Sequence, residues 1–191
     1  MSEEKKNAEQ PSPALGEKLM KTRSIMLTGE ITKESADQVI RNLLVMDSEG
    51  NDPITIYINS PGGDVDGGFA IYDMIRFISS PVRTVGIGLV ASAAVIVLLA
   101  AEKEHRYGFA NSTYLIHQPM TEMRGVAADI EIHAQNMEHC RQMTDSIIAQ
   151  ACGRSIEEVH RDTERDHWIY SQGAVEYGLI SRVITTKDEL K

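Results

Sequence analysis

The sequence predicts a single α/β domain built around a largely parallel sheet. Short β-rich runs alternate with segments whose apolar residues recur at helical spacing, which is typical of strand–helix–strand units. The chain of 191 residues has the size of one domain and shows no internal repeat. We expect one folded domain at residues 23–186, preceded by a mobile N-terminal arm at 1–22 and followed by a short tail at 187–191.

The individual elements follow from the period of the apolar residues, with proline, glycine and asparagine marking the loops. In the first half these signals predict a strand at 24–27, a helix from 32, a strand at 54–58, a turn at 59–63, a helix over 69–78 and a strand at 82–87. In the second half they predict a helix at 92–101, two strands flanking 111–112, a helix at 125–152, helices from 155 and at 171–177, and a strand at 179–184.

Composition excludes several classes of function. The net charge of −9 argues against a nucleic-acid partner, because phosphates would be repelled over most of the surface. The most apolar run, 90–101, is too short to cross a bilayer, and residues 1–10 lack the apolar region of a signal peptide. Cys140 and Cys152 lie about 18 Å apart along one predicted helix, too far for a disulfide. We therefore expect reduced thiols, a cytoplasmic protein and no membrane association.

The turn at the end of the second predicted strand contains Gly62 and Gly63. Glycines allow a positive φ and a close backbone approach, so an amide here could stabilise an oxyanion. A simple tight turn is the alternative. No Gly-Lys-Ser/Thr follows, so the chain has no Walker A motif and is not expected to hydrolyse ATP.

Ser92 stands between apolar residues where a predicted strand meets a helix. Its hydroxyl could be a nucleophile supported by the amide of Ala93, or it could simply cap the helix. The surrounding sequence is not a G-x-S-x-G elbow, so an α/β-hydrolase is not indicated.

His117 ends a predicted strand, where a rigid backbone could present it as a base, although a structural histidine is the alternative. Asp166 closes the mixed-charge run 161–166, which is either a solvated face or the source of a carboxylate that orients the histidine. No HExxH or paired histidine pattern occurs, so no metal site is predicted. Taken together, these residues could form an acyl-transfer site.

The order Ser, His, Asp in these settings resembles the ClpP family, the proteolytic subunits of the Clp protease. The matching stretches are Tyr57-Ile58-Asn59-Ser60-Pro61-Gly62-Gly63, Ala91-Ser92, Ile116-His117-Gln118-Pro119, Asp129-Ile130-Glu131-Ile132-His133-Ala134, Glu164-Arg165-Asp166 and Ala174-Val175-Glu176-Tyr177-Gly178-Leu179. The resemblance extends from about residue 23 to residue 184. Ala93-Ala94 departs from it, because methionine and glycine are usual there, and so does Thr55, where an aromatic residue is common.

The resemblance implies a crotonase-like α/β fold with a long handle helix after Gly125. It assigns Ser92 as nucleophile, His117 as general base, Asp166 as its orienting acid, and the amides of Gly63 and Ala93 as the oxyanion hole. It also implies a serine endopeptidase that needs no cofactor of its own and hydrolyses unfolded proteins inside two stacked heptameric rings.

The same resemblance implies partners. A Clp-type AAA+ unfoldase would use the ATP and dock at a pocket formed by Tyr57, Val85, Ile87, Tyr107 and Phe109, and Arg165 would lie at the contact between rings. A second ClpP-type subunit could share the assembly. Alternatives are an inactive ring subunit of a mixed assembly, a crotonase-fold acyl-thioester enzyme and, last, a membrane-linked Ser-Lys peptidase.

Overall fold

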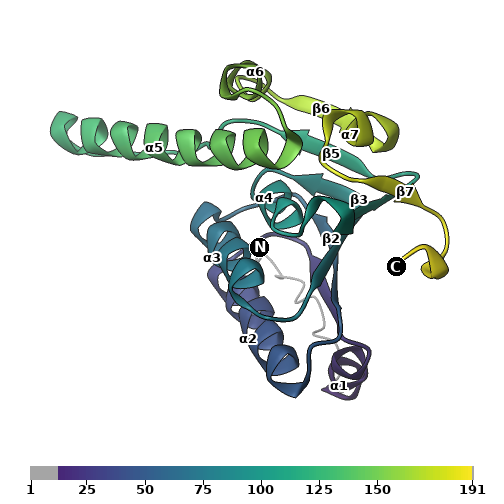
Figure 1. Ribbon diagram of the computed structural model, residues 1–191. Helices are drawn as coiled ribbons and strands as arrows, with labels where there is room; N and C mark the ends of the chain where they lie inside the picture. The colour runs from purple at the N-terminus through teal and green to yellow at the C-terminus, as the bar shows by residue number, and fades with distance from the viewer. Residues whose placement is uncertain (1–12, 191) are drawn as a thin grey trace, which may run out of the picture.

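A seven-stranded sheet organises the fold of the computed structural model, which describes residues 13–190 (Figure 1). Five parallel neighbours lie in the order β1 (Ser24–Thr28), β2 (Ile54–Ser60), β3 (Val82–Ala91), β4 (Arg106–Phe109) and β7 (Arg182–Ile184). β3 is long enough to pair twice, first with β4 and then with β5 (Thr113–Ile116), which also pairs antiparallel with β6 (His167–Tyr170). The predicted α/β class with largely parallel pairing is confirmed.

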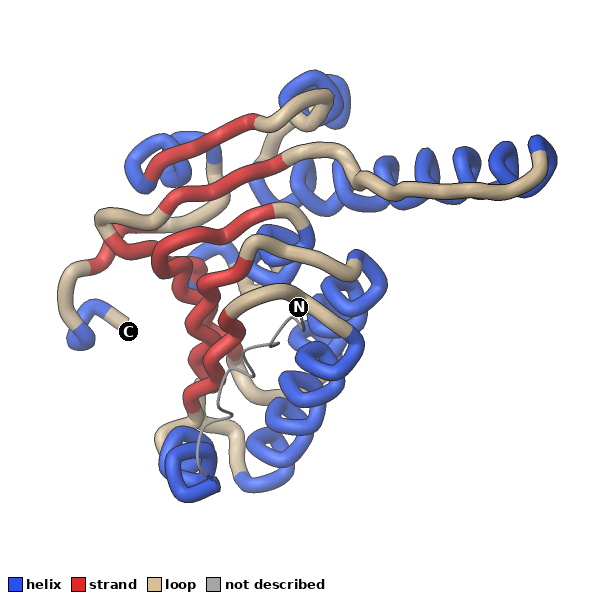
Figure 2. Tube along the Cα trace, turned by 180° about the vertical axis from the view of Figure 1, so that it is seen from behind, coloured by secondary structure: helices blue, strands red, loops and turns tan. Residues whose placement is uncertain are grey.

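Helices cover one face of this sheet and one helix projects beyond it (Figures 1 and 2). The helices are α1 (Pro13–Lys21), α2 (Lys33–Glu49), α3 (Val65–Phe77), α4 (Ala93–Leu99), α5 (Ala127–Cys152), α6 (Ile156–Asp162) and α7 (Ser171–Tyr177), with 3₁₀ turns at Lys103–His105 and Lys187–Glu189. In Figure 2 the segment 117–126 runs beside the projecting part of α5. This pair forms the long handle that the sequence predicted.

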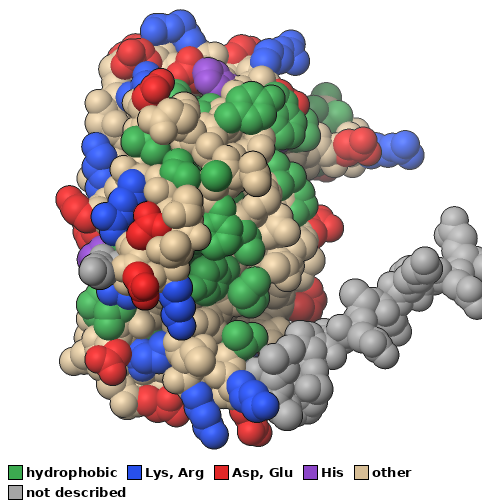
Figure 3. Space-filling view, turned by 90° about the vertical axis from the view of Figure 1, so that its right-hand side faces the viewer, with side chains coloured by type: hydrophobic (Ala, Val, Ile, Leu, Met, Phe, Trp, Pro, Cys, Tyr) green, Lys and Arg blue, Asp and Glu red, His purple; other side chains and the backbone are tan. Residues whose placement is uncertain are grey.

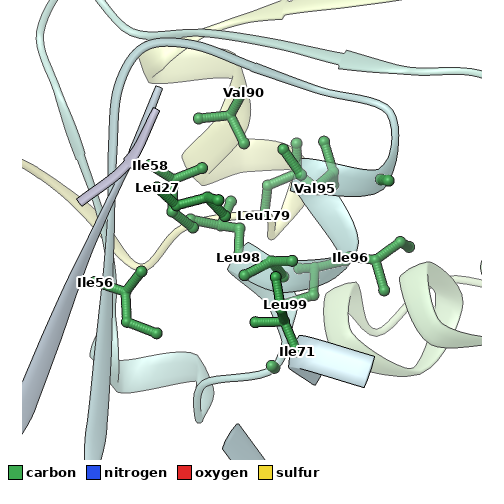
Figure 4. Packing of buried hydrophobic residues seen from close by; sticks show 14 of the residues in the cluster. Leu27, Ile56, Ile58, Ile71, Val90, Val95, Ile96, Leu98, Leu99 and Leu179 are labelled. Carbon is green, nitrogen blue, oxygen red and sulfur yellow. The ribbon is translucent and has the colours of Figure 1, made fainter. Parts of the chain in front are cut away.

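The core lies between the sheet and helices α2, α3 and α4. Helix α4 is buried along its whole length, and its side chains meet those of β1, β2 and α3 (Figure 4). Leu27, Ile56, Ile71 and Leu98 are all within 2% of complete burial. A helix that is apolar on every side is stable only when it is buried on every side. Helix α4 therefore lies in the core directly after the end of β3.

Local sequence signals set several boundaries as predicted. Thr32 Oγ1 accepts from the amide of Ser35 at 3.2 Å, while Ser35 Oγ accepts from the amide of Thr32 at 2.9 Å. Ser155 and Glu158 form the same reciprocal capping box at the start of α6. Helix α5 ends at Gly153, whose φ of 68° gives the left-handed conformation that glycine adopts without strain.

Three segments differ from the sequence prediction. Pro13–Lys21 forms α1 within the region expected as an arm, because Met20 finds apolar surface and packs against the core. β6 was not predicted: the run is short, and of its residues only Ile169 is buried. The tail at 187–191 contains a 3₁₀ turn closed by Glu189, whose pKa is lowered to about 2 by hydrogen bonds from the amides of Thr185 and Thr186. Residues 1–12 lie outside the described residues.

Arg23 joins three parts of the chain at the start of β1. Its guanidinium donates to the carbonyls of Met46, Asp52 and Gly50 at 2.7, 2.9 and 3.0 Å and to Ser80 Oγ at 3.0 Å. Arg23→Ala would leave these acceptors unpaired, and we expect it to lower the free energy of unfolding by about 2 to 3 kcal/mol.

Urea denaturation at fixed protomer concentration measures this change. The exposed Arg41, whose ion pair is with Asp37 one helical turn away, provides the control, and Arg41→Ala is expected to cost much less than Arg23→Ala. Equal losses in the two variants would show that the Arg23 contacts contribute no more than a surface ion pair.

Candidate active site

Ser92 lies between the carboxyl end of β3 and the start of α4. Its backbone has a φ of 56°, one of only two positive values among the non-glycine residues described. Although Ser92 occupies the N-cap position, its hydroxyl makes no capping hydrogen bond, so the capping interpretation is not realised. A strained serine that does not serve its own helix is typical of a functional residue.

Gly62 makes room for Ser92. A Cβ atom at Gly62 would lie 2.6 Å from the Ala91 carbonyl oxygen, 2.7 Å from the Ser92 Cβ and 3.0 Å from the Ala93 amide nitrogen. Its φ of 89° is also a conformation that glycine favours. The turn after β2 therefore packs directly against the serine, which requires the absence of a side chain.

The backbone amides of Gly63 and Ala93 belong to the residues next to this contact. Ile31 pairs with Gly63 by donating to the Gly62 carbonyl at 2.7 Å and accepting from the Asp64 amide at 2.8 Å. These two hydrogen bonds use the Gly62 carbonyl and the Asp64 amide, so the Gly63 amide takes no part in the pairing with Ile31. The Ala93 amide is the first of α4 and has no helical acceptor.

His117 and Asp166 are joined by a direct contact, with 3.2 Å between His117 Nδ1 and Asp166 Oδ1. The two residues are 49 positions apart, and the antiparallel pairing of β5 with β6 brings them together, with Ile116 opposite His167. The His117 side chain is 13% exposed, whereas the Asp166 side chain is 61% exposed. The contact occupies Nδ1, and so leaves Nε2 as the ring nitrogen for a second partner.

Ser92 and His117 line the same small cavity of about 20 Å³. The amide of Ser92 donates to the Leu115 carbonyl at 2.9 Å, which ties the end of β3 to the strand that carries His117. Among residues 13–190, Ser92 Oγ has no hydrogen-bond partner. The remaining lining is largely apolar and comes from α3, α4, β5, α5 and the segment between β5 and α5: Val65, Ala93, Ile96, Ile116, Pro119, Thr144 and Ile148.

No competing nucleophile is evident among the thiols. Cys140 and Cys152 are both free, as predicted. Burial, with a smaller effect from the charge of Asp66, raises the pKa of Cys140, and burial raises the pKa of Cys152 to about 11. Both cysteines are therefore protonated near neutral pH and are weak nucleophiles.

Within residues 13–190, no cluster of three or more His, Cys, Asp or Glu is arranged to hold a metal ion. In the same part of the chain, no helix combines the length and apolar character needed to span a membrane.

Comparison with known proteins agrees with this geometry. A family model described as Clp protease matches residues 7–187. ATP-dependent Clp protease proteolytic subunit 2 of Treponema denticola is 51% identical over 190 residues, covering 99% of this chain and 95% of the relative. The chain belongs to the Clp protease family. The resemblance recognised over residues 23–184 is thus confirmed, and the match extends into the N-terminal segment.

Other members of the family support the fold and the activity. The subunit of the same name from Treponema pallidum is 49% identical, with 98% of this chain and 95% of the relative covered. A solved structure of a point mutant of ClpP1 from Listeria monocytogenes has a TM-score of 0.87 at 44% identity, covering 93% of this chain and 99% of that chain. The ClpP-type fold is therefore confirmed, and the function is that of a proteolytic subunit with serine peptidase activity.

The five residues assigned to ATPase docking in this Clp protease family member lie together on the open face of the sheet. In the strand pairing, Tyr57 of β2 lies beside Val85 of β3, and Val85 lies beside Tyr107 of β4, so the three side chains share one face of the sheet. The neighbouring Ile56 and Ile58 point to the opposite face and pack against the helices. Val85 and Tyr107 are completely buried, in part by Ile184 and Leu190, which the sequence analysis did not include.

Tyr57 and Ile87 are partly buried, and Phe109 is 42% exposed. Figure 3, which views the side where β7 and the C-terminus lie, shows a band of hydrophobic side chains. Only these three of the five assigned residues offer accessible surface. Arg165 is exposed beside Asp166.

Proposed function

We propose that Ser92, His117 and Asp166 form the catalytic triad of this peptidase. The observation that carries the proposal is the contact between His117 and Asp166, together with the cavity that His117 and Ser92 both line. Ser92 Oγ attacks the carbonyl carbon of a peptide bond while its proton passes to His117 Nε2. The Asp166 carboxylate, in contact with His117 Nδ1, keeps the imidazole ring oriented and stabilises the imidazolium that forms.

The tetrahedral intermediate carries a negative oxygen, and we assign its stabilisation to the amides of Gly63 and Ala93. His117 then donates its proton to the leaving amine as the carbon–nitrogen bond breaks, which leaves an ester on Ser92. A water molecule, deprotonated by His117, attacks this ester and regenerates the serine. These steps consume one water molecule per bond and require no cofactor or metal.

We further propose that the subunit acts in two stacked heptameric rings that receive unfolded proteins from a Clp-type AAA+ unfoldase, which hydrolyses the ATP. The unfoldase contacts Tyr57, Ile87 and Phe109, while Val85 and Tyr107 support them from beneath. Arg165 lies at the ring contact, and a second ClpP-type chain can share the assembly. The 23–186 peptidase domain, the short tail at 187–191 and the cytoplasmic location belong to the same proposal.

The rate at which a fluorophosphonate labels Ser92 tests the triad without depending on the unfoldase. In the assembled protein we expect labelling at Ser92 alone, identified by mass spectrometry after digestion. Asp166→Asn removes the charge that stabilises the imidazolium, so we expect a labelling rate lower by roughly a hundredfold to ten-thousandfold. Glu157→Gln, which removes the charge of an exposed carboxylate on α6, is the matched control and is expected to change the rate by less than about threefold.

Labelling at another serine would remove Ser92 from the proposed role. An unchanged rate in Asp166→Asn would remove Asp166, since its carboxylate would then contribute nothing to activating the serine.

A further inference from the structure

Asp166 depends on other residues for its position. Its side chain is largely exposed and its contact is with His117, at 3.2 Å. It also lies in the connection between α6 and β6 rather than within a helix or strand. An exposed carboxylate on a connecting segment samples several rotamers unless the backbone beneath it is fixed, so the support for this segment matters for catalysis.

Gln118 holds this connection directly against the base. Its amide donates to the Thr163 carbonyl at 2.7 Å, and its Nε2 donates to the Glu164 carbonyl at 2.7 Å. Gln118 follows His117 in sequence, and the two acceptors lie three and two residues before Asp166. The backbones that carry the base and the acid are therefore fixed to each other by two hydrogen bonds.

Asp145 holds the same connection from the other side. It lies on α5, is 1% exposed, and accepts a hydrogen bond from Thr163 Oγ1 at 2.8 Å through Oδ1. Thr163 is also 1% exposed. The hydroxyl of Thr163 therefore donates to a buried carboxylate, while its carbonyl accepts from the Gln118 amide. These two hydrogen bonds fix the backbone of the segment between α6 and β6 to the interior of the protein.

The other groups around Asp145 strengthen this anchor. Asp145 Oδ2 lies 2.9 Å from His160 Nδ1 and 3.9 Å from Arg141 Nε. Arg141 also donates to Glu164 Oε2 at 2.6 Å and to the His160 carbonyl at 3.2 Å. The hydrogen bond from Arg141, and then its charge, lower the pKa of Glu164. A buried carboxylate is costly without such partners, so Asp145 belongs to a polar network rather than to an isolated contact, in which Arg141 contributes its charge at 3.9 Å and no direct hydrogen bond to Asp145.

We propose that Asp145 and Thr163 are positioning residues for catalysis: their buried hydrogen bond fixes the segment that presents Asp166 to His117. This inference rests on the proposed triad. Neither residue touches substrate, and both act through Asp166.

Thr163→Val tests the proposal, because it removes the hydroxyl and keeps the shape of the side chain. We expect kcat for a fluorogenic peptide to fall between about tenfold and a hundredfold with KM nearly unchanged, since the loss of alignment affects the transition state. Thr163→Ser restores the hydroxyl and is expected to restore kcat to within about threefold. Asp145→Ala, which removes the acceptor, is expected to lower kcat as Thr163→Val does.

A double-mutant cycle with Asp166→Asn separates positioning from a general loss of stability. If Thr163 acts through Asp166, then adding Thr163→Val to Asp166→Asn has no further effect on the Ser92 labelling rate. Thr84→Val is the matched structural control, because Thr84 is equally buried and its hydroxyl donates to the Leu98 carbonyl at 2.9 Å, far from this network. It is expected to lower the melting temperature and leave kcat unchanged.

The outcomes distinguish this inference from the triad itself. A normal kcat in both Thr163→Val and Asp145→Ala, together with loss of activity in Asp166→Asn, would overturn the positioning role and leave the triad intact. The positioning role would also be overturned if the double variant labelled Ser92 more slowly than Asp166→Asn alone, by the same factor that Thr163→Val causes in the wild type. A normal labelling rate in Asp166→Asn would instead show that the triad assignment failed. If Thr163→Val does not assemble, Asp145→Ala in the same cycle provides the decisive comparison.

Discussion

Replacing Ser92 with alanine is expected to reduce peptide hydrolysis by at least about a thousandfold. The hydroxyl makes no hydrogen bond within residues 13–190, and the helix it precedes does not use it as a cap. The substitution therefore removes the proposed nucleophile without removing a structural contact, so the fold and the oligomer mass should be those of the wild type. Hydrolysis of a short fluorogenic peptide, with the mass of the assembly recorded on the same sample, measures both.

Ser48→Ala is the control for this experiment, because Ser48 is an exposed serine whose hydroxyl donates only to the Val45 carbonyl. It should retain full activity. Residual activity of Ser92→Ala near that of the wild type would mean that another residue is the nucleophile. An inactive wild-type protein that forms intact rings would favour a subunit whose activity depends on a second ClpP-type chain.

Gly62→Ala is expected to reduce hydrolysis by about a hundredfold or more, although Gly62 takes no part in the chemical steps. Its new methyl group would meet the Ala91 carbonyl oxygen at 2.6 Å and the Cβ of Ser92 at 2.7 Å. The turn or the serine must therefore move, and either movement changes the distance between the Gly63 amide and the proposed oxyanion position next to Ser92. The φ of 89° adds strain of about 1 to 3 kcal/mol.

Gly153→Ala is the control that separates backbone strain at a positive φ from the displacement of Ser92 by a new methyl group. Gly153 also has a positive φ, of 68°, but a Cβ there meets nothing within 4 Å. We expect this control to lose stability and keep its activity. If both glycine variants lose activity in proportion to their loss of melting temperature, the contact between Gly62 and Ser92 is not what limits catalysis.

The sequence predicts the framework of this site well, because strong local signals coincide with its elements. Thr32 and Ser155 cap their helices as predicted, and Gly153 ends α5. Ser92 and His117 were expected at the carboxyl ends of strands, and both lie there. Such positions can be recognised without tertiary structure, since each depends on residues within a few positions in the chain.

What could not be predicted depends on contacts between distant segments. The four residues of β6 have no strong strand signal of their own and pair only because β5 is next to them. Asp145 is one of many polar residues on a long helix, and nothing local indicates that Thr163, 18 positions later, binds it. Val85 was assigned to the docking pocket, but it is fully buried, in part because Leu190 at the chain end packs against the same cluster.

The pairing of β5 with β6 also determines when the peptidase can become active during its own synthesis. Asp166 lies 74 residues after Ser92 in the sequence (166 − 92). At a translation rate of about 5 to 20 residues per second, the ribosome therefore adds Asp166 about 4 to 15 s after Ser92. Throughout that interval the nascent chain holds the proposed nucleophile and, later, the proposed base, but not the carboxylate assigned to orient that base. The proposed triad is therefore complete only once β6 has been translated and has paired with β5.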